Sequence, residues 1–444
     1  MAKLTDYERH EIPDWLYMAH VENEDVAIGG GGVIWNSGNF AGVWEEGVFN
    51  DGNFEGTWLT GEFNGGTFVD GVFKEGTVEN AKVLNGLFEK VTIKGSEVFN
   101  ATFISVVAEG IEMLNGVWEN GEAIGCVFKN ILWKNGIAES CEFEKCNWLD
   151  GTMIDSIKKD GYWCNGKAIS GCEFYEVTWE DGLWDSNLFT DGIWENGEFL
   201  DGEFLHSLWK NGIFDADKME FSTWENGEVL GADIFLNVLW KNGVWDGDLF
   251  TGSGASAKTY GVSNGCIWEN GIWKDGLFGD YNPRGRLWVT FEEYIEETPA
   301  ELKQESLKTG GSIWINGEFI DGGFAEAIWC HGLARAGEFK DMLWLDGKTI
   351  DIEFLDSTWV EGVFGSDGGV FDRSIWLGGL FLGGRFRESQ WFGGKFEANG
   401  IFENSVWEEG QFSQDAEWVS GEFKGIAYHK GIIVKAPKDP YNIE

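Results

Sequence analysis

The sequence has 444 residues and carries 76 acidic against 32 basic side chains, a formal net charge of −44 at pH 7. This charge argues against nucleic acid as a direct ligand, because nucleic-acid-binding surfaces concentrate lysine and arginine.

The 26 Trp and 34 Phe residues can fill a core without disulfides. The seven cysteines form no CxxC pair, which favours reduced, buried thiols that fill space as small apolar groups, and folding in the cytoplasm. A disulfide between Cys126 and Cys141 is the alternative.

Residues 1–33 do not follow the periodic pattern of the rest of the chain. They contain Pro13 and an apolar cluster around Trp15 and Tyr17. Because the bare end of a stacked sheet invites other chains to add to it, we interpret this segment as a cap or attachment arm, with Trp15 and Tyr17 as candidate partner contacts. The segment lacks the apolar core of a signal peptide, and no stretch is long enough to span a membrane. We therefore expect synthesis in the cytoplasm and no membrane partner.

Tryptophan recurs with a fixed period along residues 34–278. Most steps are 15 residues, and a large or small apolar residue falls about every five residues between them. A repeat this short cannot bury its own apolar face, so successive repeats must stack as an all-β solenoid. The periodic tryptophans of this first column include Trp118, Trp133, Trp148, Trp163, Trp179, Trp194, Trp209, Trp224 and Trp240.

The local unit is five residues long, as in the stretch from Gly192 to Phe199. Residues two apart share one face of a strand, so the small residue Gly192 and the aromatic Trp194 are predicted to face inward. Asn196 and Gly197 then form a corner, because both residue types tolerate a left-handed backbone. The corner residues after the tryptophans predict an Asn/Asp ladder of Asn120, Asn135, Asp150, Asn165, Asp181, Asn196, Asn211, Asn226 and Asn242.

Five-residue units with a small inward residue and a large apolar one resemble pentapeptide-repeat proteins. That resemblance implies a right-handed, four-sided β-helix with four units per coil. This chain differs in using Gly or Ser with Trp, and in its 15-residue period. We favour a three-sided coil, because like residues then stack on like, and keep the four-sided coil as the alternative with handedness open. About 23 levels at roughly 4.8 Å each predict a solenoid about 105 Å long.

One excursion, residues 279–311, interrupts the solenoid. Thr298, Pro299, Glu301 and Gly310 are typical of the start and end of a short helix, predicted over 299–309. The excursion is either a contact surface or a loop folded back on the solenoid. The solenoid then continues over 312–425, and residues 426–444 form a C-terminal cap and tail. The candidate partner contacts in the excursion are Arg284, Arg286, Trp288 and Tyr294.

No catalytic, cofactor or metal site is expected. The five histidines are scattered without ligand spacing, and the glycine-rich stretch 161–168 ends in Ala168 where a phosphate-binding loop needs Ser or Thr. We therefore predict a non-enzymatic structural protein, an acidic scaffold, spacer or interaction arm whose partners are other structural proteins of a larger assembly.

Long stacked solenoids of this kind are similar to components of tailed-bacteriophage particles, which implies a place in the tail, baseplate or head decoration of a virion. Two alternatives remain open. The resemblance to pentapeptide-repeat proteins implies a DNA-mimicking regulator or inhibitor of a DNA-binding enzyme such as gyrase. Exposed stacked aromatics would instead imply a carbohydrate-binding adhesin. The oligomeric state is left open by the sequence.

Overall fold

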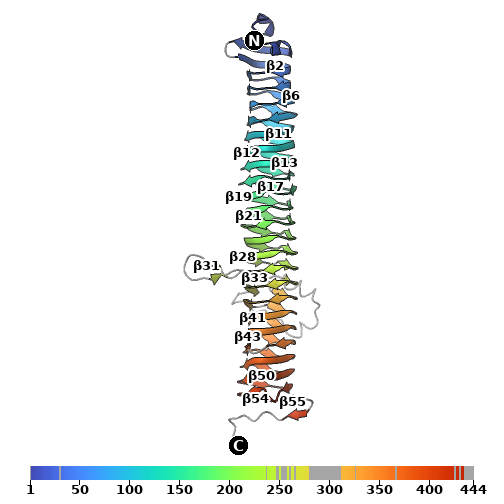
Figure 1. Ribbon diagram of the computed structural model, residues 1–444, viewed down its shortest axis with the longest axis vertical. Coiled ribbons are helices and arrows are strands. Elements are labelled where there is room, and N and C mark those ends of the chain that lie inside the picture. The colour runs from blue at the N-terminus through green and yellow to red at the C-terminus, as the bar shows by residue number, and fades with distance from the viewer. Residues whose placement is uncertain are drawn as a thin grey trace. The chain divides into compact units, whose positions relative to one another are not determined.

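The computed structural model describes residues 2–29, 32–236, 238–246, 267–279, 312–325, 327–365 and 368–424, together with the short segments 250–251, 258–259, 262–264, 427–429 and 432–434. The chain divides into two compact units, Met1–Gly202 and Glu203–Glu444. Each unit is a parallel β-solenoid of stacked coils, about 22 coils in all, with almost no helix (Figure 1). The predicted all-β solenoid is confirmed.

Strand pairing fixes the number of sides of the coil. In unit 1, Trp118 of β12 (Glu112–Ile124) pairs with Trp133 of β13 (Val127–Glu139), 15 residues later. In unit 2, β42 (Leu343–Trp344) pairs with β44 (Thr358–Trp359) at the same spacing. Inward residues lie five apart, so three units complete one coil. The three-sided coil is confirmed, and the four-sided alternative, which needs about 20 residues per coil, is wrong for these coils.

The inward side chains form three columns in each unit, which we call A, B and C in chain order from each periodic tryptophan. Column A holds the tryptophans. Trp118 and Trp133 stack with ring centroids 4.8 Å apart and planes 3° apart, and Trp329 and Trp344 of unit 2 stack at 4.6 Å and 7°. This spacing matches the distance between neighbouring strands, so ring stacking and backbone pairing run in step.

Two insertions leave column A unbroken. Trp240 of β29 (Leu239–Trp240) stacks on Trp268 of β34 (Ile267–Trp268) at 4.6 Å. Trp268 in turn stacks at 4.8 Å on Trp314 of β37 (Ser312–Trp314). Column A therefore continues from one level of the coil to the next on either side of each insertion. The helix expected over 299–309 lies outside the described residues.

The N-terminal segment covers the first coil of unit 1. The short helices η1 (Leu4–Asp6) and α1 (Asp14–Tyr17) precede β1 (His20–Gly29), which pairs antiparallel with β2 (Gly32–Trp44). The ring of Trp15 lies 4.9 Å from that of Trp44, at the end of column A.

In unit 2, β54 (Gly421–Phe423) carries the last ring of column A, and Phe423 stacks on Trp407 at 6.2 Å. It is followed by an antiparallel hairpin of β55 (Ala427–His429) and β56 (Ile432–Val434).

Candidate functional site

The corner between columns A and B is built around glycine. Gly347 has a φ of +125°, and a Cβ added to it would lie 2.6 Å from the carbonyl oxygen of Gly332, one coil earlier. A side chain at this position would therefore overlap backbone, so only glycine fits. The predicted ladder of corner amides is present outside it: the Asn226 side-chain N–H donates to Asn211 Oδ1 at 3.2 Å, and that of Asn242 to Asn226 Oδ1 at 3.1 Å.

Some tryptophan N–H groups also bond at this corner. The indole N–H of Trp224 donates to the carbonyl of Asn242 at 3.0 Å, and that of Trp376 to the carbonyl of Gly393 at 3.0 Å. Tryptophan thus fills the core and reaches a corner carbonyl of the following coil, which phenylalanine cannot do.

The corner between columns C and A uses serine in unit 2. Here the residue before each serine takes the left-handed conformation, as Arg373 does with a φ of +46°. The N–H of Ser357 donates to Ser374 Oγ at 2.9 Å, and the Ser374 hydroxyl donates to the carbonyl of Asp372 at 2.7 Å. The same pattern repeats from Ser374 to Ser389 and from Ser389 to Ser405, each at 3.0 Å.

Buried cysteines take the place of serine in unit 1. The N–H of Cys126 lies 3.4 Å from Cys141 Sγ, and the N–H of Cys141 donates to Ser156 Oγ at 2.9 Å. Both thiols are free, so the disulfide alternative is not realised. The hydrogen bond with Cys126, together with burial, raises the pKa of Cys141. The thiols are reduced and buried as expected, and Cys141 also accepts a hydrogen bond from the corner backbone.

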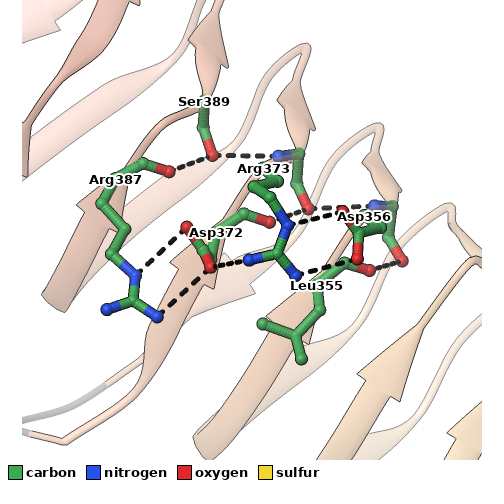
Figure 2. A network of polar contacts seen from close by, with 8 residues as sticks. Leu355, Asp356, Asp372, Arg373, Arg387 and Ser389 are labelled. Atoms are coloured by element: carbon green, nitrogen blue, oxygen red, sulfur yellow. Dashed lines mark hydrogen bonds and ion pairs between the residues drawn. The ribbon is translucent and has the colours of Figure 1, made fainter.

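A charged cluster lies outside the serine ladder of unit 2, where β43 (Lys348–Leu355), β46 (Val370–Asp372) and β48 (Leu380–Arg387) end (Figure 2). Asp372 is only 2 % exposed although it follows an inward phenylalanine on the strand. Its carboxylate lies 2.6 Å from Arg373 Nη1 and 3.1 Å from Arg387 Nε.

Arg373 also holds a second carboxylate. Its Nε and Nη2 donate to Asp356 at 2.8 and 2.9 Å, so one guanidinium joins carboxylates of two successive coils (Figure 2). This hydrogen bonding lowers the pKa of Asp356 below its usual value. Two acids and two arginines balance in charge, and the buried carboxylate is covered. The cluster is therefore suited to holding three coils together, and not to acid–base chemistry.

One lysine is buried inside unit 1. Lys158 is 0 % exposed and occupies column C between Phe143 and Phe174, where the pattern predicts an apolar residue. Its ammonium donates to the carbonyls of Cys146 and Asp160, both at the corner between columns C and A. Burial lowers the pKa of Lys158 to about 8. The sequence analysis did not single out this residue. The available signal was that a lysine stands at an inward position of the five-residue repeat.

The outer surface over column A carries no charge along one part of unit 2. In unit 1 this surface carries paired charges, such as Lys134 Nζ 2.7 Å from Glu119. Between Glu269 and Glu408, the outward residues on either side of six successive tryptophans carry none. We call these residues the neutral strip: Ile313, Ile315, Ile328, Cys330, Leu343, Leu345, Thr358, Val360, Ile375, Leu377, Gln390 and Phe392.

The residues predicted to contact partners fall into two groups. The ring of Trp15 packs on Trp44 and Phe40 of the first coil. Tyr17 is 56 % exposed, with the guanidinium of Arg9 4.0 Å above its ring. The remaining candidates lie outside the described residues: Arg284, Arg286, Trp288 and Tyr294.

The described residues contain no group of three or more His, Cys, Asp or Glu side chains placed to hold a metal ion. A small hollow beside the tryptophans of β29 and β34 has room for about one water molecule, which is too little for a cofactor. No helix among the described residues is long and apolar enough to cross a membrane.

No family model, curated protein or solved structure matches the chain.

Proposed function

We propose that this chain is a non-enzymatic structural protein, an acidic scaffold or spacer with a pentapeptide-repeat-like solenoid, that works within a bacteriophage particle. The observation that carries the proposal is the column of stacked indoles in each unit, with neighbouring rings 4.6–5.0 Å apart in the coils of unit 2 from Trp209 to Trp407. The assignment to a virion rests on the resemblance to solenoid components of tailed phages.

Stiffness follows from the way the interior is bonded. Backbone pairing runs along every column, and ring stacking runs along column A from Trp209 to Trp407, so bending unit 2 would separate strands and rings on one side together. Each aromatic pair contributes about 0.5–1.5 kcal/mol beyond the burial of its area. The serine ladder and the Asp356–Arg373 pair add bonds in the same direction. A chain that serves as a spacer needs this resistance to bending.

The outer surface favours a soluble spacer. Carboxylates dominate it, and several lysines pair with acids of the neighbouring coil, as Lys94 does with Glu109 at 2.8 Å and Lys241 with Glu225 at 2.9 Å. The excess of one sign keeps such aromatic-rich chains apart in solution. At the first coil, β1 covers part of the strand edge that would otherwise pair with other chains.

Two measurements test the proposal. Small-angle X-ray scattering should give a maximum dimension close to the length of about 105 Å expected from the coil spacing. Purification of the intact chain from its native source should recover structural proteins in stoichiometric amounts. A Tyr17→Ser variant is expected to reduce this recovery, whereas Tyr162→Ser, which changes an exposed tyrosine on the side of unit 1, should not.

Other outcomes would redirect the assignment. Stoichiometric recovery of gyrase or another DNA-binding enzyme, lost at high salt, would overturn the scaffold role in favour of DNA mimicry. Recovery on immobilised oligosaccharide would favour an adhesin.

A further inference from the structure

The neutral strip is an apolar surface on an otherwise strongly acidic chain. Its twelve positions span six coils, so it is about 24 Å tall and roughly 10 Å wide, an area of about 240 Å². Exposure changes along it. Ile313 is 2 % exposed and Ile267, on the preceding coil, 1 %, whereas Ile375 and Phe392 at the far end are 38 % and 40 % exposed. The outward side chains are therefore covered at one end.

The covered end is where a long piece of chain joins the coil. Strand β36 (Leu277–Gly279) ends and β37 (Ser312–Trp314) begins at the corner between columns C and A, beside Ile313. Residues 280–311, which connect these two strands in the sequence, lie outside the described residues. About five extended residues reach roughly 17 Å, which is more than three coils along the strip.

The charge around the strip selects its occupant. Exposed acids flank it on both sides, Asp341 on one and Asp346 and Glu361 on the other. A matching occupant has an apolar centre and basic margins. Residues 284–291, with the sequence Arg-Gly-Arg-Leu-Trp-Val-Thr-Phe, combine two arginines with four large apolar side chains and no acid.

The small area also favours a segment of the same chain. A stable complex of separate proteins buries about 800 Å² on each partner, several times the area of the strip. A second copy would in addition bring another highly acidic chain close to this one. A tethered segment avoids most of the translational and rotational entropy cost of association, so a small apolar contact suffices to hold it.

We propose that residues 284–291 dock on the neutral strip, with Leu287, Trp288 and Phe291 against its apolar side chains and Arg284 and Arg286 toward the flanking acids. Docking would fix the excursion against unit 2 and present its remaining residues at a defined place on the solenoid. This inference does not depend on the proposed scaffold role, and its test does not require a partner.

The chain contains its own probe for this contact. Cys330 belongs to the strip, and Cys164 occupies the equivalent position after Trp163 in unit 1. The experiment measures the alkylation rate of each cysteine by iodoacetamide in the full-length chain, with peptide mass spectrometry as the readout. It compares the natural chain with a variant carrying Leu287→Ser, Trp288→Ser and Phe291→Ser. Each cysteine is compared only with itself, because the hydrogen bond to Glu180 raises the pKa of Cys164.

We expect the triple variant to raise the alkylation rate of Cys330 at least about tenfold and to leave Cys164 unchanged. A second variant, Leu345→Asp, should release Cys330 in the same way from the other side of the contact. Buried Cys141 reports on folding, because it reacts only if the coils open.

Two results would overturn the proposal. The first is an equal Cys330 rate in the natural chain and in both variants while Cys141 stays protected. The second is protection of Cys330 that increases with protein concentration, which would identify a second copy as the occupant.

Discussion

The corner between columns A and B and the corner between columns C and A make the same change of direction with different residues. At the first, Gly332 and Gly347 take a φ near +125° themselves. At the second, the residue before the corner serine takes the left-handed conformation, and the serine keeps an inward side chain. A coil therefore turns in two ways: one excludes a side chain, and the other uses it to bond the backbone of the preceding coil.

The largest effect should come from placing a side chain at the glycine corner. Gly347→Ala is expected to lower the free energy of unfolding by roughly 2–6 kcal/mol, because it adds a positive-φ penalty to overlap with the carbonyl of Gly332. Chemical denaturation followed by tryptophan fluorescence measures the loss. The matched control is Ser374→Ala at the other corner, which adds no atom. If Gly347→Ala lowers the free energy of unfolding no more than Ser374→Ala does, the glycine corner does not exclude a side chain more strictly than the serine corner.

Lys158 tests whether a buried charged group can bond the backbone at the corner between columns C and A, as serine does in unit 2. The folded chain loses the Lys158 proton at about pH 8, and the unfolded chain at its ordinary value of 10.5. The unfolded state therefore binds more protons between these values, and the stability of the natural chain should rise relative to Lys158→Met over this window. The expected gain is about 3 kcal/mol.

Comparing unfolding free energies at pH 7.5 and pH 10.5 measures this gain. Lys159→Met, at the exposed neighbour, should show no such change relative to the natural chain. A flat difference for Lys158→Met would mean that the folded chain holds the Lys158 proton as tightly as the unfolded chain does, so that burial does not lower the pKa of this amine.

The charged cluster outside the serine corner should have a smaller effect. Arg373→Ala leaves Asp356 without its two-pronged bond and Asp372 with Arg387 alone, so we expect a loss of about 2 kcal/mol. Because the folded pKa of Asp356 lies below its ordinary 3.8, the contribution is full above about pH 4 and disappears as the pH falls through the folded value.

Denaturation of Arg373→Ala and of the natural chain at pH 7 and pH 3 would show whether the difference in unfolding free energy is smaller in acid. Arg385→Ala, at an exposed arginine two residues from Arg387, is the control. An equal loss for both arginines would argue that the cluster does not hold the coils together.

The smallest effect is expected within the serine ladder. Ser374→Ala removes the acceptor of the Ser357 N–H and should cost about 1–2 kcal/mol. Ser374→Cys should recover part of the loss, because unit 1 uses Cys141 in the equivalent role. If cysteine is no better than alanine in denaturation experiments, the thiol contacts of unit 1 are packing contacts and not hydrogen bonds.

The sequence by itself predicted the 15-residue coil, the inward columns and the corner amides. These features repeat at every level, so any arrangement that stacks like on like must align them. Trp118 and Trp133, for example, could be paired from their spacing alone, and the register confirms it.

Only the tertiary structure decided which residue at each corner takes positive φ, that Ser374 bonds the coil before it, and that Asp372 and Lys158 are buried. These features depend on which carbonyls and side chains of the preceding and following coils lie close to each residue. The five-residue pattern states which face a residue occupies, but carries no information about what the next coil places against it.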